Sequence, residues 1–470
     1  MTELRRAGAM AELLGPWLTR QRWFAAKGTA LAGLDRVGGL LLHDDGCDGD
    51  GDVVVLVHLV AAVAADGART VYQVPLTYRR SADPTLSGAM IGVFEHPDHG
   101  ELLVYDGVHD PAFVHALVRL LNGGRAGADE GLTGGAVGVM QRVEPPPDGP
   151  ATVLAGEQSN TSIIVDAAGP DPMIIKLFRV LQPGSNPDVV VQTRLAAAGC
   201  DRVPLPVGWI EGAWAGPGGG LVSGHLAYAC EFMAGSEDAW RVACRAVEAG
   251  EAFDQQAHGL GVATAQVHLL LAETMPTRPA DPHLLAKLAD GLQARVHWAV
   301  GLVPALAPYR DAALAAMDAV RTVAGAPDLQ QVHGDYHLGQ VLHSPTRGWV
   351  LLDFEGEPLR PLAERLEPDL ALRDIAGMTR SFDYAAQHAV VGLPADDPRR
   401  VAATAWSQHA RGAFLAGYAD AGGHHTRADA DLLRALELDK AMYEAVYETL
   451  NRPTWLDIPM AAVHRLASTG

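Results

Sequence analysis

The chain has 470 residues, enough for two or three domains that each bury a hydrophobic core. It carries 36 Lys and Arg residues against 56 Asp and Glu residues, a net charge of −20, which argues against binding to nucleic acid or anionic membranes through a basic surface. The four cysteines form no CxxC pair, and no apolar stretch is long enough to span a bilayer. We therefore expect a cytoplasmic protein with reduced thiols and with no nucleic-acid or membrane partner.

The first part of the chain, to about residue 150, is predicted to be rich in β-strands. Residues 53–57 and 70–76 are runs of β-branched and apolar side chains bounded by Gly and Asp. The proline-rich segment 145–150 suits neither a helix nor an inner strand, so it is predicted to be a connector.

Beyond the connector, residues 161–166 and 173–178 are two short apolar runs separated by a turn sequence, and they predict a β-hairpin. A third apolar run, 226–230, ends in Glu-Phe-Met-Ala-Gly. From about residue 236 the hydrophobic pattern becomes helical. The order predicts a β-rich unit, then a small β lobe, then a large α-helical lobe.

One polar loop among these predicted helices carries the strongest chemical pattern. His333-Gly334-Asp335 begins it, an amide side chain follows at Gln340, and Asp353 comes directly after an apolar run. Phosphoryl transfer requires a carboxylate that orients the acceptor hydroxyl and oxygen ligands for Mg²⁺. A carboxylate, an amide oxygen and a second carboxylate therefore predict a catalytic base beside a magnesium site.

The pattern His-Gly-Asp-x-His-x-x-Gln, followed by Asp-x-Glu, resembles the aminoglycoside phosphotransferase branch of the protein-kinase-like enzymes. The resemblance implies an α+β, bilobal protein-kinase-like fold with a small β-rich N-lobe and a large α-helical C-lobe, and it implies ATP as co-substrate with Mg²⁺. It also implies that Asp335 is the catalytic base, that Gln340 and Asp353 bind Mg²⁺, and that Glu355 lies near the metal. His337 would either pack the loop or contact the substrate.

The nucleotide site is expected on the predicted strands that precede residue 236. Lys176 interrupts an apolar run at the place of the phosphate-binding lysine of kinase-like folds, although a strand-edge charge is the alternative. The segment 156–162 has one glycine and many polar side chains, so three of them are expected to bind the phosphates: Ser159, Asn160 and Thr161. The backbone of Glu231 and Met233 is expected to bind adenine where the lobes join.

Further segments extend the likeness over nearly the whole chain and resemble the actinobacterial maltokinases in order and spacing: residues 17–28, 156–162, 176–179, 183–188, 373–382 and 438–448. This resemblance implies an extra β-rich cap at the N-terminus. The expected division is a cap subdomain over 1–90, an intermediate subdomain with the kinase N-lobe over 91–235, and the C-lobe over 236–470.

Two departures from the maltokinase pattern concern charged contacts. Position 190 is Val190 where maltokinases usually have Glu, so the partner of Lys176 is Asp188, another residue or none. Near the C-terminus, Tyr-Glu-x-Arg-His-Arg-Pro-x-Trp-Leu-Pro becomes a sequence with Leu450, Asn451 and Asp457 at the changed positions.

These changes predict the acceptor. Asp439, Tyr443, Tyr447 and Asn451 recur every four residues and are expected to share one helix face. Trp455 offers a flat surface for a sugar, and an adjacent carboxylate, Asp457, suits a cationic group. We therefore expect a 2-amino sugar to be bound by six residues: Asp335, His337, Tyr447, Asn451, Trp455 and Asp457.

The predicted function is ATP-dependent phosphorylation of D-glucosamine to D-glucosamine 6-phosphate, because actinobacterial glucosamine kinases are a sister group that resembles the maltokinases. A maltokinase that forms maltose 1-phosphate is the first alternative, since the scaffold is shared. An aminoglycoside phosphotransferase is the next, because an acidic cleft suits a polycationic substrate. A pseudokinase that binds nucleotide without turnover is the alternative from a different class. The oligomeric state and the role of the cap stay open.

Overall fold

The computed structural model describes residues 7–25, 31–44, 52–96, 100–127, 135–141, 149–154, 159–357, 361–394, 396–423 and 427–468. The chain divides into two compact units: Met1–Val189 with Leu205–Ala234, and Val190–Pro204 with Gly235–Gly470. Three pieces of the predicted features lie outside the described residues: 26–28 of the cap segment, 145–148 of the connector and 156–158 of the phosphate-binding segment.

The first unit begins with a six-stranded antiparallel sheet. Its strands follow the order β1-β2-β3-β5-β4, and the short strand β11 (Val180–Leu181) pairs with β3. The bounds are β1 (Leu31–Asp44), β2 (Val53–Ala64), β3 (Arg69–Arg79), β4 (Met90–His96) and β5 (Gly100–Asp106). The strands predicted at 53–57 and 70–76 are confirmed as parts of β2 and β3.

Strand β2 places alternate side chains in two different hydrophobic cores. Val55, Val57 and Leu59 join a core that contains helix α2 (Pro111–Leu121), while Val54, Leu56 and Val60 join one that contains helix α1 (Ala7–Leu18). Side chains of a strand alternate in direction, so this continuous apolar run buries both faces of the sheet. The expectation of a strand-rich first 150 residues left out these two helices, which cover those faces.

The second sheet of the first unit is antiparallel and has seven strands in the order β6-β7-β12-β13-β10-β9-β8. Its strands are β6 (Arg125–Gly127), β7 (Gly135–Met140), β8 (Ala151–Val153), β9 (Asn160–Val165), β10 (Met173–Phe178), β12 (Pro206–Ala215) and β13 (Leu221–Glu231). The predicted hairpin is confirmed as β9 and β10, and the run at 226–230 lies in β13.

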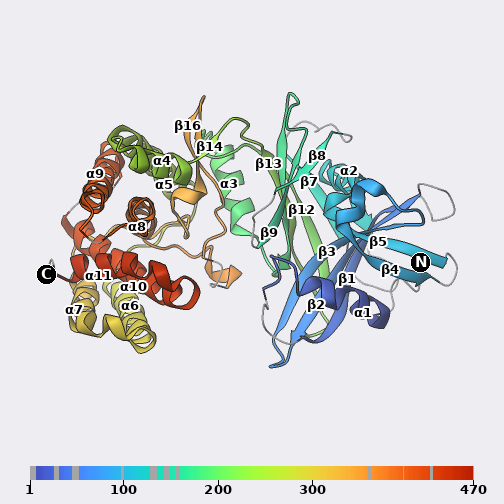
Figure 1. Cartoon of the computed structure of the whole chain (residues 1–470), viewed down its shortest axis with the longest axis horizontal. Helices are drawn as coiled ribbons and strands as arrows, with labels where there is room; N and C mark the ends of the chain where they lie inside the picture. Colours follow the sequence, from blue (N-terminus) through green and yellow to red (C-terminus); the bar gives the residue numbers. More distant parts are fainter. Residues whose placement is uncertain are drawn as a thin grey trace. The chain divides into compact units, whose positions relative to one another are not determined.

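The two sheets of the first unit form one body (Figure 1). The structure places no division between residues 90 and 91, because Met90 begins β4, which pairs with β5 and so continues the first sheet. Residues of β2, β10 and β13 also share one hydrophobic core. The expected cap over 1–90 is therefore packed together with strands β10 and β13. The unit ends at Ala234, one residue before the boundary expected at 235.

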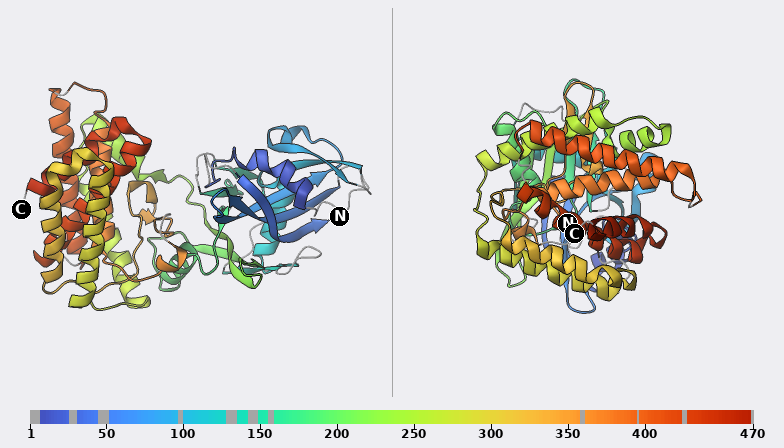
Figure 2. Two further views of the ribbon diagram at one scale, coloured as in Figure 1. Left: turned by 90° about the horizontal axis from the view of Figure 1, so that it is seen from below. Right: turned by 90° about the vertical axis from the view of Figure 1, so that its left-hand side faces the viewer.

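The second unit is mostly helical, as the pattern from residue 236 predicts, and its long helices pack beside one another (Figure 2). Helix α3 (Pro187–Ala197) begins in the first unit and continues into the second. The other helices are α4 (Ala239–Ala249), α5 (Asp254–Thr274), α6 (Pro282–Leu302), α7 (Arg310–Ala319), α8 (Leu372–His388), α9 (Pro398–Asp420), α10 (Arg427–Asn451) and α11 (Asp457–Ser468). Among the helices described, none is both long and apolar enough to cross a membrane.

A small sheet of three strands, β14 (Glu237–Asp238), β15 (Val341–Ser344) and β16 (Gly348–Leu351), lies among these helices. β15 and β16 form an antiparallel pair in which Val341 lies opposite Leu351. The predicted catalytic loop precedes β15, and Asp353 follows β16. The hairpin therefore brings the two halves of the sequence pattern to the same end of the sheet.

Candidate active site

The backbone of the catalytic loop is held by one buried carboxylate. Asp374 is 1% exposed and accepts hydrogen bonds from the backbone N–H groups of His333 (2.7 Å) and Gly334 (2.9 Å). It also bonds to the ring of His268 at 3.0 Å. Burial alone would raise the pKa of Asp374, but these hydrogen bonds lower it below its ordinary value, so the group is ionised at neutral pH.

Two glycines let the loop approach its neighbours, the segment after β16 at Gly334 and helix α8 at Gly377. Gly334 has φ +86°, where a β-carbon would lie 3.0 Å from the Cα of Gly356. At Gly377 of α8, a β-carbon would lie only 2.4 Å from the carbonyl oxygen of Tyr336. A side chain at either position would push the loop away from its support, so both positions require glycine.

The predicted catalytic base is partly buried beside a lysine. The side chain of Asp335 is 29% exposed, and its Oδ1 lies 3.7 Å from Nζ of Lys440 on α10. Nζ of Lys440 also lies 3.3 Å from Oε1 of Glu357. Burial alone would lower the pKa of Lys440, but Asp335, Glu357 and Glu444 raise it, so the lysine is a cation at neutral pH.

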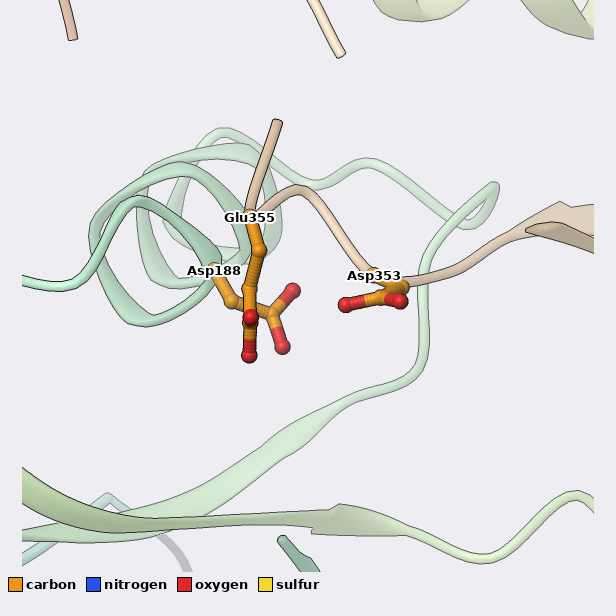
Figure 3. Close-up of side chains that lie close together, drawn as sticks. All are labelled: Asp188, Asp353 and Glu355. Atoms are coloured by element: carbon orange, nitrogen blue, oxygen red, sulfur yellow. The ribbon is translucent and has the colours of Figure 1, made fainter. Parts of the chain in front are cut away.

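Two of the predicted metal ligands, Asp353 and Glu355, follow strand β16 and lie close together (Figure 3). The side-chain amide of Gln340 donates a 3.1 Å hydrogen bond to Oδ2 of Asp353. Asp353 takes a left-handed conformation with φ 61°, and one of its carboxylate oxygens lies within 4.8 Å of one of Glu355. Two carboxylates and one amide oxygen form a donor set of hard oxygen ligands, which fits Mg²⁺.

The two histidines of the loop have different surroundings. His333 is 2% exposed, bonds through Nε2 to the carbonyl oxygen of Leu352 at 2.7 Å, and packs its ring against Phe354. His337 accepts a hydrogen bond at Nδ1 from the backbone N–H of Gly339. Burial lowers the pKa of His337, so its neutral ring carries the proton on Nε2.

A cavity of about 540 Å³ opens over the loop, and we call it the catalytic-loop cavity. Its volume lies in the range of small-molecule sites. Asp335, His337 and Trp455, three of the six predicted acceptor-binding residues, line it. The other lining residues are Asp238, Trp240, Tyr336, Gly339, Gly377, Ser381, Tyr384, His388, Lys440, Glu444 and Arg452.

The aromatic wall of this cavity contacts an ion pair between a buried carboxylate and a partly exposed arginine. Arg452 donates two hydrogen bonds to Glu448, which is 1% exposed, and its guanidinium lies 4.7 Å from the ring centre of Trp455. Tyr384 stacks on Trp455 with ring centres 6.4 Å apart. Trp455 therefore has little freedom to rotate, and it offers a fixed flat surface to a ligand.

A second carboxylate of the cavity has one oxygen without a protein partner. Nε and Nη2 of Arg380 both donate to Oε2 of Glu444, at 2.9 and 2.7 Å. Among the described residues, none donates a hydrogen bond to Oε1 of Glu444. The side chain is 13% exposed, so this oxygen is an acceptor in a mostly buried setting.

Three predicted acceptor-binding residues do not line the cavity: Tyr447, Asn451 and Asp457. Tyr447 is 46% exposed, and the amide of Asn451 donates to the carbonyl oxygen of Tyr447. An α-helix turns by about 400° over four residues, so each such step moves a side chain about 40° around the axis, and Asn451 is about 120° from Asp439. Asp457 is exposed at the first position of α11, where a carboxylate suits the helix dipole.

The lysine expected to bind the nucleotide phosphates, Lys176, lies in the first unit and forms an ion pair there. Nζ of Lys176 on β10 lies 3.2 Å from Oδ2 of Asp188, in the first turn of α3 (Figure 3). The side chains are 15% and 2% exposed. Of the possibilities left open by Val190, the structure therefore supports Asp188.

The polar residues expected to bind the phosphates are not equivalent. Ser159 is exposed, whereas Asn160 and Thr161 are buried. Oγ1 of Thr161 accepts a 2.8 Å hydrogen bond from Nε of Arg179, a buried residue whose guanidinium lies 4.5 Å from the ring centre of Trp23. Through Arg179, this hydroxyl therefore connects strand β9 to the turn that follows helix α1.

The residues expected to bind adenine lie at the end of β13. The backbone N–H of Glu231 donates to the carbonyl oxygen of Leu205, so this group is not available as a donor to adenine. The carboxylate of Glu231 accepts a hydrogen bond from the backbone N–H of Leu205. Met233 is partly exposed just before the first unit ends at Ala234.

Sequence reasoning missed the roles of Asp374, Lys440 and Glu444. All three lie in segments 373–382 and 438–448, which were noted only for their resemblance to maltokinases. Charged residues at four-residue spacing on α10, Lys440 and Glu444, were the available signal that this helix has a polar inner face.

Comparisons with known proteins agree with this geometry. Residues 17–110 match the maltokinase N-terminal cap domain. A glucosamine kinase of Streptacidiphilus jiangxiensis is 31% identical over 324 residues, which cover 64% of this chain and 70% of that protein. A glucosamine kinase of Mycolicibacterium smegmatis is 29% identical over 329 residues, covering 67% and 79%.

Solved structures share the fold over nearly the whole chain. A glucosamine kinase in complex with glucosamine, ADP and inorganic phosphate has a TM-score of 0.63 at 24% identity, covering 97% of this chain and 98% of that one. A second crystal form of a glucosamine kinase has a TM-score of 0.66 at 22% identity, covering 97% and 99%. The cap, the β-rich first unit and the helical second unit thus occur together in solved structures.

Proposed function

Because this chain belongs to the glucosamine kinase family, within the aminoglycoside phosphotransferase and protein-kinase-like superfamily, we propose that it transfers the γ-phosphoryl group of ATP to the 6-hydroxyl of D-glucosamine. Family membership makes it an ATP-dependent phosphotransferase with a sugar hydroxyl as acceptor. The observation that carries the finer proposal is the catalytic-loop cavity. Asp335, Trp455 and the mostly buried carboxylate of Glu444 all line it.

Asp335 is the catalytic base in this proposal. It accepts the proton of the acceptor hydroxyl while the hydroxyl oxygen bonds to the γ-phosphorus and the bond to the ADP oxygen breaks. Lys440 keeps the carboxylate in the cavity and is itself held by Glu357. The hydroxyl is thus oriented by a group whose own position is restrained.

Gln340, Asp353 and Glu355 would hold Mg²⁺. When bound, the ion neutralises phosphate charge and stabilises the transferring group. Lys176, oriented by Asp188, supplies the cation for the nucleotide phosphates.

The sugar ring packs on Trp455, and its ammonium group bonds to the unoccupied oxygen of Glu444. A charge-assisted hydrogen bond in a buried setting distinguishes an amine from the hydroxyl of glucose. This assignment replaces Asp457, which lies outside the cavity.

Mg²⁺-dependent ADP release tests the function with glucosamine, glucose, maltose and N-acetylglucosamine as acceptors. We expect the highest kcat/KM with glucosamine and a ³¹P–¹H correlation that places the phosphate on C6. Asp335→Asn should lower kcat by at least about 10²-fold while ATP still binds. ADP release that does not depend on any of these sugars would contradict the proposal.

Maltose is the second candidate acceptor, because residues 17–110 match the maltokinase cap domain. A higher kcat/KM with maltose, and a product phosphorylated at C1, would favour it over glucosamine.

A further inference from the structure

A second cavity shares Lys440 with the catalytic-loop cavity, and we call it the α6–α10 cavity. It has a volume of about 270 Å³, and helices α6, α8 and α10 and the catalytic loop form it. Tyr336, Gly377 and Lys440 line both this cavity and the catalytic-loop cavity. The residues that line only the second cavity are Arg295, Trp298, Gly334, Glu357, Arg373, Ala376, Leu436, Asp439 and Tyr443.

One wall of the α6–α10 cavity is aromatic. Trp298 of α6 and Tyr443 of α10 stack with ring centres 6.2 Å apart and an angle of 25° between the rings. Trp298 is 44% exposed, although large apolar side chains of this kind are usually covered. Within the part of the chain that the structure describes, neither the indole N–H of Trp298 nor the hydroxyl of Tyr443 makes a hydrogen bond.

One turn away on the same two helices, the lining consists of paired charges. Arg295 donates two hydrogen bonds to Asp439, one from Nε to Oδ1 at 2.7 Å and one from Nη2 to Oδ2. Nη1 of Arg373 lies 3.9 Å from Oδ2 of Asp439, and Lys440 pairs with Glu357. These pairs fix planar donors and acceptors around the cavity and leave no large net charge there.

We propose that the α6–α10 cavity binds a second saccharide ring, an inference that rests on the proposed function. A flat aromatic face suits the apolar face of a sugar, and fixed guanidinium and carboxylate groups suit its hydroxyls. The volume lies just below the usual range for small-molecule sites, so the cavity takes one ring and not a longer chain.

The ring has two possible sources, which share this chemistry. It is the second ring of a disaccharide acceptor whose first ring occupies the catalytic-loop cavity, or it is a separate sugar molecule. Lys440 lines both cavities, and its Nζ lies 3.7 Å from Oδ1 of Asp335, the proposed catalytic base. A ligand in either cavity therefore adjoins the same group.

The first experiment measures kcat/KM for glucosamine and for its β-1,4-linked disaccharide. In Trp298→Ala we expect kcat/KM for the disaccharide, divided by kcat/KM for glucosamine, to fall at least about tenfold relative to the unaltered protein. Tyr443→Phe removes only a hydroxyl and should lower the same ratio about threefold. Leu302→Ala, an exposed residue one turn from Trp298 on α6, is the matched control and should leave the ratio unchanged.

The second experiment measures the number of glucosamine molecules bound per chain by titration calorimetry, without nucleotide. If the unaltered protein binds two glucosamine molecules and Trp298→Ala binds one, while the kcat/KM ratio of disaccharide to glucosamine is unchanged, the second ring is a separate sugar molecule. The proposal is overturned if both variants keep the acceptor ratio and the binding number of the unaltered protein. Failure of the proposed function is distinct, because glucosamine would then release no ADP in any variant.

Discussion

Nζ of Lys440 lies 3.7 Å from Oδ1 of Asp335, so a helix more than 100 residues later in the chain supplies the cation beside the carboxylate proposed as the catalytic base. The same Nζ lies 3.3 Å from Oε1 of Glu357, four residues after the proposed metal ligand Asp353. One ammonium group thus links α10 to the catalytic loop and to the segment that follows β16. The position of Asp335 depends on the packing of α10 as well as on its own loop.

Lys440→Met keeps most of the side-chain length and removes the charge. We expect kcat with glucosamine to fall about 10–100-fold, because Asp335 loses the group that restrains it, while the KM for ATP stays within about twofold. Steady-state kinetics check this, and Lys287→Met at an exposed position of α6 is the control. An unchanged kcat would show that Lys440 has no part in positioning Asp335.

Asp188→Asn should weaken nucleotide binding. The side chain keeps its shape but loses the charge that orients Lys176, so we expect the KM for ATP to rise at least about tenfold with little change in the KM for glucosamine. Combining it with Lys176→Met in a double-mutant cycle should give a coupled and not an additive loss. Additive losses, or the same loss in Asp171→Asn at the exposed hairpin turn, would contradict the pairing.

Glu444→Gln and Asp457→Asn distinguish two candidates for the ammonium-binding carboxylate. Because Glu444 lines the cavity and Asp457 does not, we expect the preference for glucosamine over glucose to fall at least about tenfold in Glu444→Gln. Asp457→Asn should keep that preference within about twofold. The reverse pattern in kcat/KM would restore the assignment made from the sequence.

Asp374→Asn and Asp420→Asn compare a buried with an exposed carboxylate, each 3.0 Å from a histidine. Asp374 is 1% exposed and holds the catalytic loop, so its replacement should lower the free energy of unfolding of the second unit by about 3 kcal/mol. Asp420 is 70% exposed, and its replacement should cost below about 0.5 kcal/mol. Urea unfolding followed by helix content measures both, and equal losses would contradict the role given to Asp374.

His58 makes the stability of the first unit depend on pH. The ring is fully buried on β2, and burial, with a smaller effect of Arg36, lowers its pKa to about 3. Its folded pKa is lower than its unfolded value of about 6.5, so the unfolded chain binds the extra proton and stability is lost as pH falls from 6.5 towards 3.

Between pH 6.5 and about 3, we expect protonation of His58 to lower the free energy of unfolding of the first unit by about 1.4 kcal/mol per pH unit. His58→Phe should remove this slope, even though loss of the hydrogen bond to Tyr78 lowers stability at every pH. Urea unfolding at pH 7 and pH 5 measures the difference. A slope that is the same in His58→Phe would exclude His58 as its source.

Much of the fold follows from local pattern. The β-branched run of β2, the hairpin β9–β10 and the helical second unit were predictable because alternation and helical periodicity are properties of neighbouring residues. Helix α2 was missed although its sequence displays an amphipathic pattern, with apolar residues on the face that packs against strands of both sheets and Arg119 on the exposed face. The absence of a division at residue 90 depends on strand pairing between segments, which the sequence does not display.

By itself the sequence determined which polar side chains the loop carries and how they are spaced. His333, Asp335, Gln340 and Asp353 lie close along the chain, so their order and spacing already indicate a base beside oxygen ligands, and the hairpin β15–β16 brings them together. Only the tertiary structure decided which residues surround that loop. Lys440, Glu444 and Asp374 reach it from distant helices, and Asp457 does not, because contact across the fold depends on the packing and rotation of each helix and not on separation along the chain.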